Sequence, residues 1–197
     1  MKPNYKNWMP KGMIWSFAAA TAVALVLTLI VSISWLKILL LILALVLAGV
    51  TVWTVLMYRA FSYDGKRQMS RHIIESVAEY VNLPEGGRCL DVGCGSGALA
   101  IAFDAVTSNY VYHNIPGRDR QAILLETLRV LKKGGTFAIH DIFSKAKYGD
   151  MQAFVKRLKD MGYEHVELIP TDNGRFMSPW EAKWMALGGS AILFGKK

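Results

Sequence analysis

Cysteine is scarce in this chain of 197 residues, and acids are missing from its first part. The two cysteines are Cys89 and Cys94. They are too few and too close to an apolar strand to make a zinc site or a disulfide scaffold, and they fit a reducing compartment. No acidic residue precedes Asp64. Most of the formal net charge of +8 therefore has its origin in an N-terminal segment without acids.

Charge of either sign is also missing from two long apolar runs, residues 13–35 and 38–58, which Lys37 separates. Each run matches the roughly 20 residues that cross a bilayer core. A signal peptide is the alternative for the first run, but its apolar region has only about 7–15 residues and ends at a cleavage site. We therefore expect residues 1–60 to form a transmembrane helical hairpin that turns at Ser34–Lys37. One long buried hairpin or a partly interfacial helix is the alternative.

Basic residues gather at the outer ends of the two runs, whereas the expected turn has Lys37 alone. The outer residues are Lys2, Lys6, Lys11, Arg59, Lys66, Arg67 and Arg71. The positive-inside rule then predicts a two-pass protein of the cell membrane with both termini in the cytoplasm. The basic excess is expected to face lipid headgroups, so the lipid bilayer is an expected partner and nucleic acid is not.

Residues 61–67 form a polar connector, and residues 68–197 are long enough for one domain with its own core. Apolar residues at helical spacing predict three helices, at 68–81, 119–131 and 151–161. In the first helix, the predicted inner face comprises Met69, Ile73, Ile74, Val77, Tyr80 and Val81. Short apolar runs predict strands at 88–92, 136–141, 165–171 and 190–195, and residues 103–112 are expected to form a strand and its outgoing loop. Alternating strands and helices predict an α/β fold with a largely parallel, doubly wound sheet.

Two local signals set the bounds of the expected helices. Asp119 can cap the helix that follows it. Lys132–Gly135 is expected to end that helix, because bases in a last turn suit the helix dipole and glycine suits the C-terminal cap.

The most informative stretch is Arg88–Gly97, in which an apolar strand leads into glycines at Gly93, Gly95 and Gly97. Glycine has no Cβ, so the loop can turn tightly and bring its backbone N–H groups close to a ligand. Asp91 ends the strand, where its carboxylate can accept hydrogen bonds from the same ligand. A glycine turn that only closes a hairpin is the alternative, but such a turn rarely needs alternating glycines behind an acid.

The segment Leu90-Asp-Val-Gly-Cys-Gly-Ser-Gly97 resembles motif I of the class I S-adenosylmethionine-dependent methyltransferases. Phe103–Val106 is similar to the fourth strand of that family, and Arg129–Phe137 is similar to the turn after the helix that follows this strand. The segments around Gly162 and Ala191 are similar to the antiparallel last strands of the family. The resemblance implies a Rossmann-like sheet with S-adenosylmethionine as the cofactor. The residues that it implies for cofactor binding are Asp91, Gly93, Cys94, Gly95, Ser96, Gly97, Ser108, Asn109 and Tyr110.

The chain is shorter than this family pattern. In the family, two strand-helix units separate motif I from the fourth strand, and they supply an acid for the ribose and a residue beside the adenine. Here residues 97–102 lead directly to Phe103, and Asp104 belongs to the fourth-strand motif, so it cannot replace the ribose acid. We expect a truncated sheet with the strand 88–92 at its edge and only the methionine end of the cofactor site present. An uncovered edge can pair with another chain, so a homo-oligomer is also expected.

Methyl transfer from a sulfonium needs the reacting atoms in line and, for some acceptors, the removal of a proton. His113 follows the fourth strand and is the candidate catalytic base, with a solvated loop histidine as the alternative. His140 and Asp141 either face the site or form a buried hydrogen-bonded pair. The last candidate group is expected to form either an apolar substrate lid or a segment that covers the core, and it comprises Phe176, Met177, Trp180 and Trp184. No metal is expected.

The expected function is methyl transfer to a small-molecule acceptor at the cytoplasmic face of the membrane, which makes a lipid-soluble acceptor one expectation. The alternative is an inactive remnant fold, a pseudoenzyme or membrane scaffold that binds cofactor weakly or not at all. A nicotinamide-dependent oxidoreductase is the third interpretation, because Gly93-x-Gly95-x-x-Ala98 fits the dinucleotide fingerprint. It needs a strand-ending acid about 20 residues beyond the loop, whereas Asp119 precedes a helix.

Overall fold

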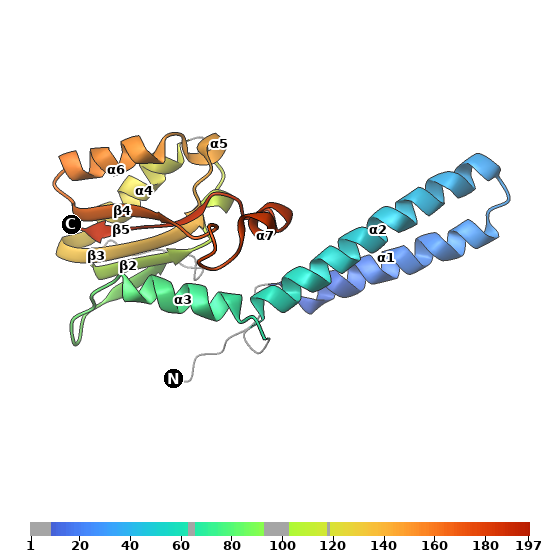
Figure 1. Ribbon diagram of the computed structural model, residues 1–197, viewed down its shortest axis with the longest axis horizontal. Coiled ribbons are helices and arrows are strands. Elements are labelled where there is room, and N and C mark those ends of the chain that lie inside the picture. Colours follow the sequence, from blue (N-terminus) through green and yellow to red (C-terminus); the bar gives the residue numbers. More distant parts are fainter. Residues whose placement is uncertain (1–8, 63–65, 93–102, 118) are drawn as a thin grey trace. The chain divides into compact units, whose positions relative to one another are not determined.

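The computed structural model of the protein describes residues 9–62, 66–92, 103–117 and 119–197. The chain divides into two compact units, Met1–Arg71 and His72–Lys197 (Figure 1). Each unit is described by itself.

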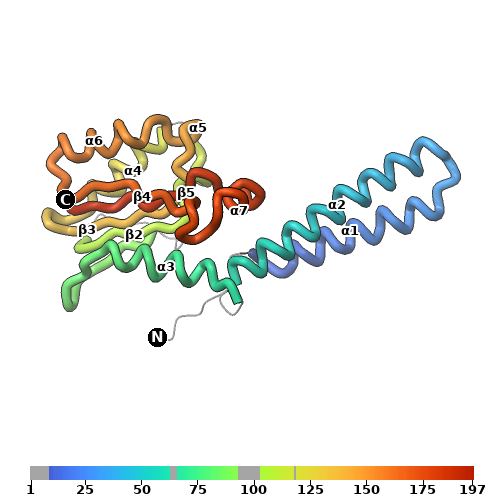
Figure 2. The backbone as a smooth tube through the Cα atoms, viewed as in Figure 1, coloured from blue at the N-terminus to red at the C-terminus, as the bar shows by residue number. Residues whose placement is uncertain are grey.

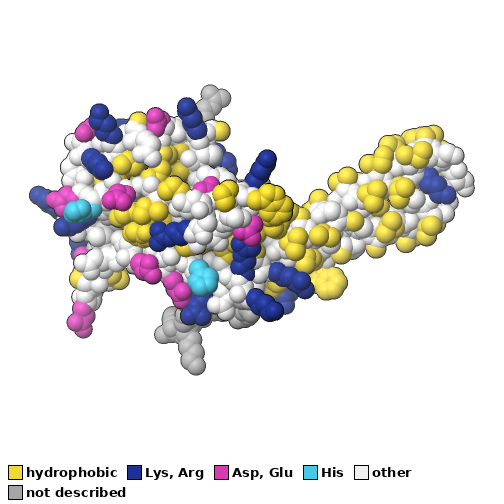
Figure 3. Space-filling view, viewed as in Figure 1, with side chains coloured by type: hydrophobic (Ala, Val, Ile, Leu, Met, Phe, Trp, Pro, Cys, Tyr) yellow, Lys and Arg dark blue, Asp and Glu magenta, His cyan; other side chains and the backbone are white. Residues whose placement is uncertain are grey.

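The first unit contains two long apolar helices, α1 (Lys11–Ile30) and α2 (Ser34–Phe61), which pack against each other as a hairpin (Figure 2). Both are long and apolar enough to cross a membrane, as judged by length and composition. Apolar side chains cover much of the hairpin surface (Figure 3). Thr28 and Thr51 donate their hydroxyl hydrogens to carbonyl oxygens four residues earlier, at 2.8 Å in both cases. Lipid tails offer no hydrogen-bond partners, so polar groups within a bilayer must bond to groups of the protein itself.

The position of the hairpin turn corrects the sequence prediction. The turn was expected at Ser34–Lys37, but α2 already begins at Ser34 and the turn comprises residues 31–33. Lys37 lies in the first turns of α2, where its backbone N–H bonds to Ile33 O at 2.9 Å. A lysine can extend its charged end away from an apolar helix, so the single charge did not mark the helix boundary.

The second unit is built on a five-stranded sheet of mixed direction. Its strands are β1 (Cys89–Val92), β2 (Phe103–Asn109), β3 (Leu131–Ile142), β4 (Glu164–Pro170) and β5 (Ser190–Lys196). Their order is β1-β2-β3-β5-β4, with β1, β2 and β3 parallel and β5 antiparallel to both β3 and β4. This confirms the α/β fold and the antiparallel end of the sheet, and among the described strands β1 lies at the edge.

Helices lie on both faces of the sheet (Figure 1). One face is covered by α4 (Arg120–Arg129), α5 (Lys145–Tyr148) and α6 (Met151–Asp160), and the other by α3 (Met69–Glu79). The short helices are a 3-10 turn (Tyr112–Asn114) and α7 (Pro179–Trp184). The main core lies under α4 and α6 and includes Val106, Leu124, Leu128, Phe137, Ile139, Phe154, Leu158 and Leu193.

Side chains alternate across β3, and this alternation places the residues of the site. Phe137 and Ile139 belong to the core beneath α4 and α6. Asp141 is two residues beyond Ile139 and projects to the same face, whereas His140 projects to the opposite face. Consecutive strand residues cannot form a side-by-side pair, so the pairing of His140 with Asp141 that the sequence allowed is wrong.

The helix starts follow local capping chemistry. Asp119 accepts a hydrogen bond from Ala122 N at 2.9 Å and caps α4, as expected. Asp150 caps α6 through Gln152 N and Ala153 N, at 2.9 and 3.0 Å. These side chains satisfy backbone donors that a helix leaves unpaired at its first turn.

The inner face of α3 is narrower than the sequence predicted. The helix ends at Glu79, and its buried positions are Met69, Ile73 and Val77, spaced four residues apart. Ile74 is 36% exposed, which corrects its expected place on the inner face. The buried residues of α3 therefore form a single stripe at every fourth position.

The segment Lys132–Gly135 also differs from its prediction. It was expected to end α4, but α4 ends at Arg129 and this segment lies in β3. The pairing register with β2 shifts here between Phe103 and Ala105. Gly134 has φ +81°, and a Cβ on Gly135 would lie 2.9 Å from Asp104 O. The two glycines thus serve an irregularity in a strand rather than a helix cap.

Candidate functional site

The candidate site lies where the parallel strands β1, β2 and β3 end. The register pairs Val92 with Ser108 and Ser108 with Ile139, and the next pair is Asn109 with His140, so residues from all three strands lie side by side here. Open α/β sheets bind ligands beyond the carboxyl ends of such strands. The motif I residues that follow β1, Gly93, Cys94, Gly95, Ser96 and Gly97, lie outside the described residues.

Asp91 is on the exposed side of β1, one residue before the strand ends. The Thr107 hydroxyl of the neighbouring strand donates to Asp91 Oδ1 at 3.2 Å. Partial burial raises the pKa of Asp91, and the hydrogen bond from Thr107 lowers it by less. A carboxylate beside the start of the motif I loop can accept hydrogen bonds from a ligand ammonium or hydroxyl group.

Ser108 and Asn109 end β2 in different environments. Ser108 is fully buried and donates its hydroxyl hydrogen to Val92 O at 3.0 Å, which ties β2 to the end of β1. Asn109 accepts from His140 Nδ1 through Oδ1 at 2.9 Å. The Asn109 Nδ2 atom is buried and has no acceptor among the described residues. Of the two, Asn109 therefore retains a donor for a ligand.

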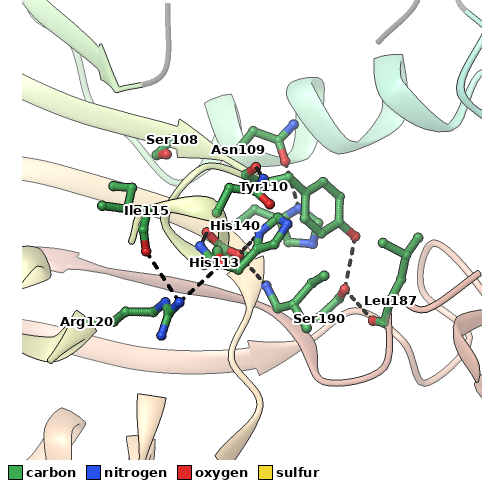
Figure 4. A network of polar contacts seen from close by, with 12 residues as sticks. Ser108, Asn109, Tyr110, His113, Ile115, Arg120, His140, Leu187 and Ser190 are labelled. Atoms are coloured by element: carbon green, nitrogen blue, oxygen red, sulfur yellow. Dashed lines mark hydrogen bonds and ion pairs between the residues drawn. The ribbon is translucent and has the colours of Figure 1, made fainter. Parts of the chain in front are cut away.

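Tyr110 has φ +55°, which turns the chain sharply after β2. Its hydroxyl shares a hydrogen bond with Ser190 Oγ at 3.0 Å. The ring packs edge-on against His140, with centroids 4.5 Å apart, and against His113 at 6.1 Å (Figure 4). Burial raises the pKa of Tyr110 well above its usual value, so this phenol remains neutral. Tyr110 therefore holds two histidines from different segments in place.

His140 is fully buried, and both of its ring nitrogens are engaged. Nδ1 lies 2.9 Å from Asn109 Oδ1, and Nε2 lies 2.9 Å from Thr171 Oγ1. Burial lowers the pKa of His140 to about 3, despite the opposing effect of the Asp141 charge. The imidazole is therefore neutral, and its nitrogens are used by the fold.

His113 has a different partner, the carboxylate of Asp141. His113 Nδ1 lies 2.6 Å from Asp141 Oδ1, and the His113 backbone N–H bonds to Asp141 Oδ2 at 3.2 Å. Asp141 is fully buried, while the His113 side chain is 15% exposed. A carboxylate oxygen accepts hydrogen bonds, so Asp141 Oδ1 pairs with the N–H of His113 Nδ1. Among the described residues, none is hydrogen-bonded to His113 Nε2.

Arg120 holds the segment around His113, a role that the sequence analysis did not identify. Its guanidinium donates to Ile115 O at 3.3 Å and to His113 O at 3.5 Å (Figure 4), and also to Lys147 O at 3.3 Å. Three carbonyl contacts from one rigid group hold the 3-10 turn and the residue that follows it beside α5. Nothing in the pattern around Arg120 distinguishes it from an exposed helical arginine.

The four apolar residues considered as a lid do not act together. Met177 is 2% exposed and belongs to the core, whereas Trp180 is 74% exposed. Phe176 lies edge-on to His140, with centroids 5.8 Å apart. Beside Phe176 is an open pocket of about 410 Å³, which is also lined by His72, Glu75, Ser76, Glu79 and Arg175.

The described residues fit one half of S-adenosylmethionine. Asp91 offers a carboxylate, and Asn109 offers an unpaired amide donor, groups that suit the ammonium and carboxylate of an amino acid. On the far side of β1 the described sheet has no further strand, so its residues offer nothing for the ribose and adenine. The residues that the structure describes also contain no cluster suited to a metal ion.

The chain is similar to one family model and to solved structures. The family model described as "Methyltransferase domain" matches residues 100–139. Among solved structures, the chain is similar to the [4+2]-cyclase SpnF, with 18% identity and a TM-score of 0.42, over 64% of this chain and 79% of that one. It is also similar to PigF with SAH, with 14% identity and a TM-score of 0.32, over 51% of this chain and 32% of that one. No protein of curated function matches the sequence.

The matched segment contains β2, α4 and most of β3, which form the centre of the second unit. The sheet around it has the parallel start and antiparallel end that the sequence predicted. The chain therefore matches the methyltransferase family model at the centre of its second unit.

Proposed function

We propose that this protein is a membrane-anchored methyltransferase that uses S-adenosylmethionine and methylates a small, lipid-soluble acceptor at the cytoplasmic face. The observation that supports it most directly is the 2.6 Å contact between His113 and Asp141, at the same edge of the sheet as Asp91. This pair supports a proton acceptor near the carboxyl ends of the parallel strands, and the carboxylate of Asp91 supports a group for the amino-acid end of the cofactor.

Each residue has a separate part in this proposal. Asp91 and Asn109 bind the amino-acid end of the cofactor, and Ser108 keeps the ends of β1 and β2 together. Tyr110 and Arg120 orient the segment that carries His113. The cofactor supplies an electrophilic methyl group, and His113 accepts the proton of the acceptor through Nε2.

The apolar hairpin supports the membrane anchor. An apolar surface of this length is unfavourable in water, and α1 and α2 each match the thickness of a bilayer core. The predicted topology is tested with a C-terminal tag in sealed membrane vesicles. Protease should remove the tag in inside-out vesicles and leave it in right-side-out vesicles. The opposite pattern would refute the cytoplasmic location.

The edge position of β1 favours a second candidate function. No strand of the described sheet lies beyond β1 to carry groups for the ribose and adenine, and an inactive remnant domain would show the same feature. In that case the hairpin and its partners would carry the function, and the second unit would bind cofactor weakly or not at all.

Equilibrium dialysis of the full chain in detergent micelles with radiolabelled S-adenosylmethionine separates the two functions. We expect saturable binding, which Asp91→Asn weakens by about tenfold or more, because charge-assisted hydrogen bonds are worth about 1.5–3 kcal/mol. The matched control is Asp160→Asn, an exposed position at the end of α6. Absence of binding in the unaltered chain would support the remnant fold.

Competition by methionine shows which half of the cofactor is held. If only the amino-acid end is bound, methionine should compete within about tenfold of S-adenosylmethionine, since the adenosyl part adds little binding energy. Much weaker competition would show that the adenosine is bound too, by residues outside the described ones or by a second copy of the chain at the β1 edge.

A further inference from the structure

The pairing of His113 with Asp141 carries a conclusion about the acceptor. We propose that Asp141 is a positioning residue that keeps His113 in its Nδ1–H form, so that Nε2 takes the proton of a hydroxyl acceptor and the enzyme methylates oxygen. This inference rests on the proposed function, because it concerns the substrate class of the same site.

The contacts of Asp141 fix both the ring and the backbone of His113. Oδ1 accepts from His113 Nδ1 and from Ile142 N, both at 2.6 Å, and Oδ2 accepts from His113 N at 3.2 Å. Three N–H donors thus converge on one fully buried carboxyl group. A carboxylate oxygen 2.6 Å from Nδ1 accepts a hydrogen bond, and this contact selects the ring form that has a free Nε2.

Other ionisable groups near Asp141 do not compete for this task. Burial raises the pKa of Tyr112 to about 12, and burial with the Asp141 charge raises the pKa of Tyr148 far above its usual value. Both phenols therefore stay neutral at physiological pH. His140 has both nitrogens engaged and a lowered pKa. Within the described site, His113 is the histidine with an unengaged nitrogen.

A firmly held base such as His113 contributes to the reaction when the methyl acceptor must lose a proton. An unprotonated amine or a thiolate attacks a sulfonium without help, whereas a hydroxyl group would become a positively charged oxonium. In the proposed step the acceptor O–H bond breaks and its proton moves to His113 Nε2. The oxygen forms a bond to the methyl carbon, and the C–S bond breaks to leave S-adenosylhomocysteine, a neutral thioether.

The first test is independent of activity. The chain has four histidines, and ¹⁵N-labelled histidine in the full chain in micelles reports which ring nitrogen of each is protonated. We expect Nδ1 to be protonated and Nε2 unprotonated for His113, and Asp141→Asn to remove this preference. The control His165→Asn, at an exposed position of β4 with φ +52°, assigns its own signal and leaves His113 unchanged. Protonation of His113 at Nε2 in the unaltered protein would overturn the proposal.

The second test uses radiolabelled S-adenosylmethionine with a simple phenol, a primary amine and a thiol as probes. Phenol methylation should fall about 10²–10⁴-fold in His113→Ala and Asp141→Asn, with cofactor binding unchanged. Added imidazole should restore part of the phenol activity of His113→Ala, which a misfolded variant would not show. Methylation of amine or thiol alone, or equal activity in His113→Ala, would refute the hydroxyl acceptor. If the unaltered chain does not bind S-adenosylmethionine, the proposed function is refuted. The protonation state of the His113 ring nitrogens is measured independently of that outcome.

Discussion

The buried His140 should make the second unit less stable as the pH falls from 7 to 5. In the folded protein, burial lowers the pKa of His140 to about 3, so the ring stays neutral over this range. In the unfolded chain the ring has its ordinary pKa near 6.5 and takes up a proton below that pH. The unfolded state therefore binds more protons, and stability is lost as pH falls below the unfolded pKa.

The magnitude follows from these two pKa values. Between pH 7 and pH 5 the unfolded state gains about 2 kcal/mol from protonating one histidine, while the folded state gains almost nothing. With a urea dependence of about 2 kcal/mol per molar, the unfolding midpoint should fall by about 1 M. Most carboxylates titrate below this window and contribute less to the change.

The assay is urea unfolding of the full chain in micelles at several pH values, for the unaltered protein and for His140→Gln. The amide of glutamine can still reach Asn109 and Thr171 but does not titrate. Stability of the unaltered protein should fall by about 2 kcal/mol more than that of His140→Gln between pH 7 and 5. Parallel pH dependences in the two proteins would refute a neutral, buried His140.

Three further substitutions test the packing, each by urea unfolding. Gly195→Ala should cost about 1–3 kcal/mol, because its Cβ would lie 2.9 Å from Phe137 Cζ, whereas Gly188→Ala, with nothing within 4 Å, should cost little; equal costs would contradict the packing described. Asp150→Ala should lose about 1 kcal/mol with the α6 cap, and Asp150→Ser should regain most of it. Phe154→Ala should cost about 3–5 kcal/mol, and a cost below about 1 kcal/mol would place Phe154 outside the core.

Features that depend on neighbouring residues could be predicted from the sequence. The strand before motif I, the cap at Asp119 and the inner face of α6 follow from apolar spacing and local hydrogen bonds. The edge position of β1 followed from the short connection between residues 92 and 103. Each of these needs only the residues of one element or the length of one connection.

The pairing within the site depends on residues far apart in the chain. His113 and Asp141 are 28 residues apart, and they meet because β2 and β3 are neighbours and because Arg120 and Tyr110 turn the intervening segment. Strand alternation alone would have shown that His140 and Asp141 face opposite sides. It would not have shown which partner each one finds.

The hairpin turn and the β3 irregularity escaped prediction for a different reason. A single lysine and a pair of glycines each fit more than one local structure, so Lys37 suggested a turn and Gly134 a helix cap. The structure places Lys37 inside α2 and Gly134 inside β3. Packing against the neighbouring element decided between the options in both cases.

The sheet order has a consequence for how such a domain can gain or lose parts. Because β1 is outermost, strands could be added beside it or removed from beside it while the pairings among β2, β3, β5 and β4 persist. A change in the middle of the sheet would instead break two ladders and open the core under α4 and α6. Growth or shortening at the β1 margin is therefore the alteration of length that this architecture tolerates best.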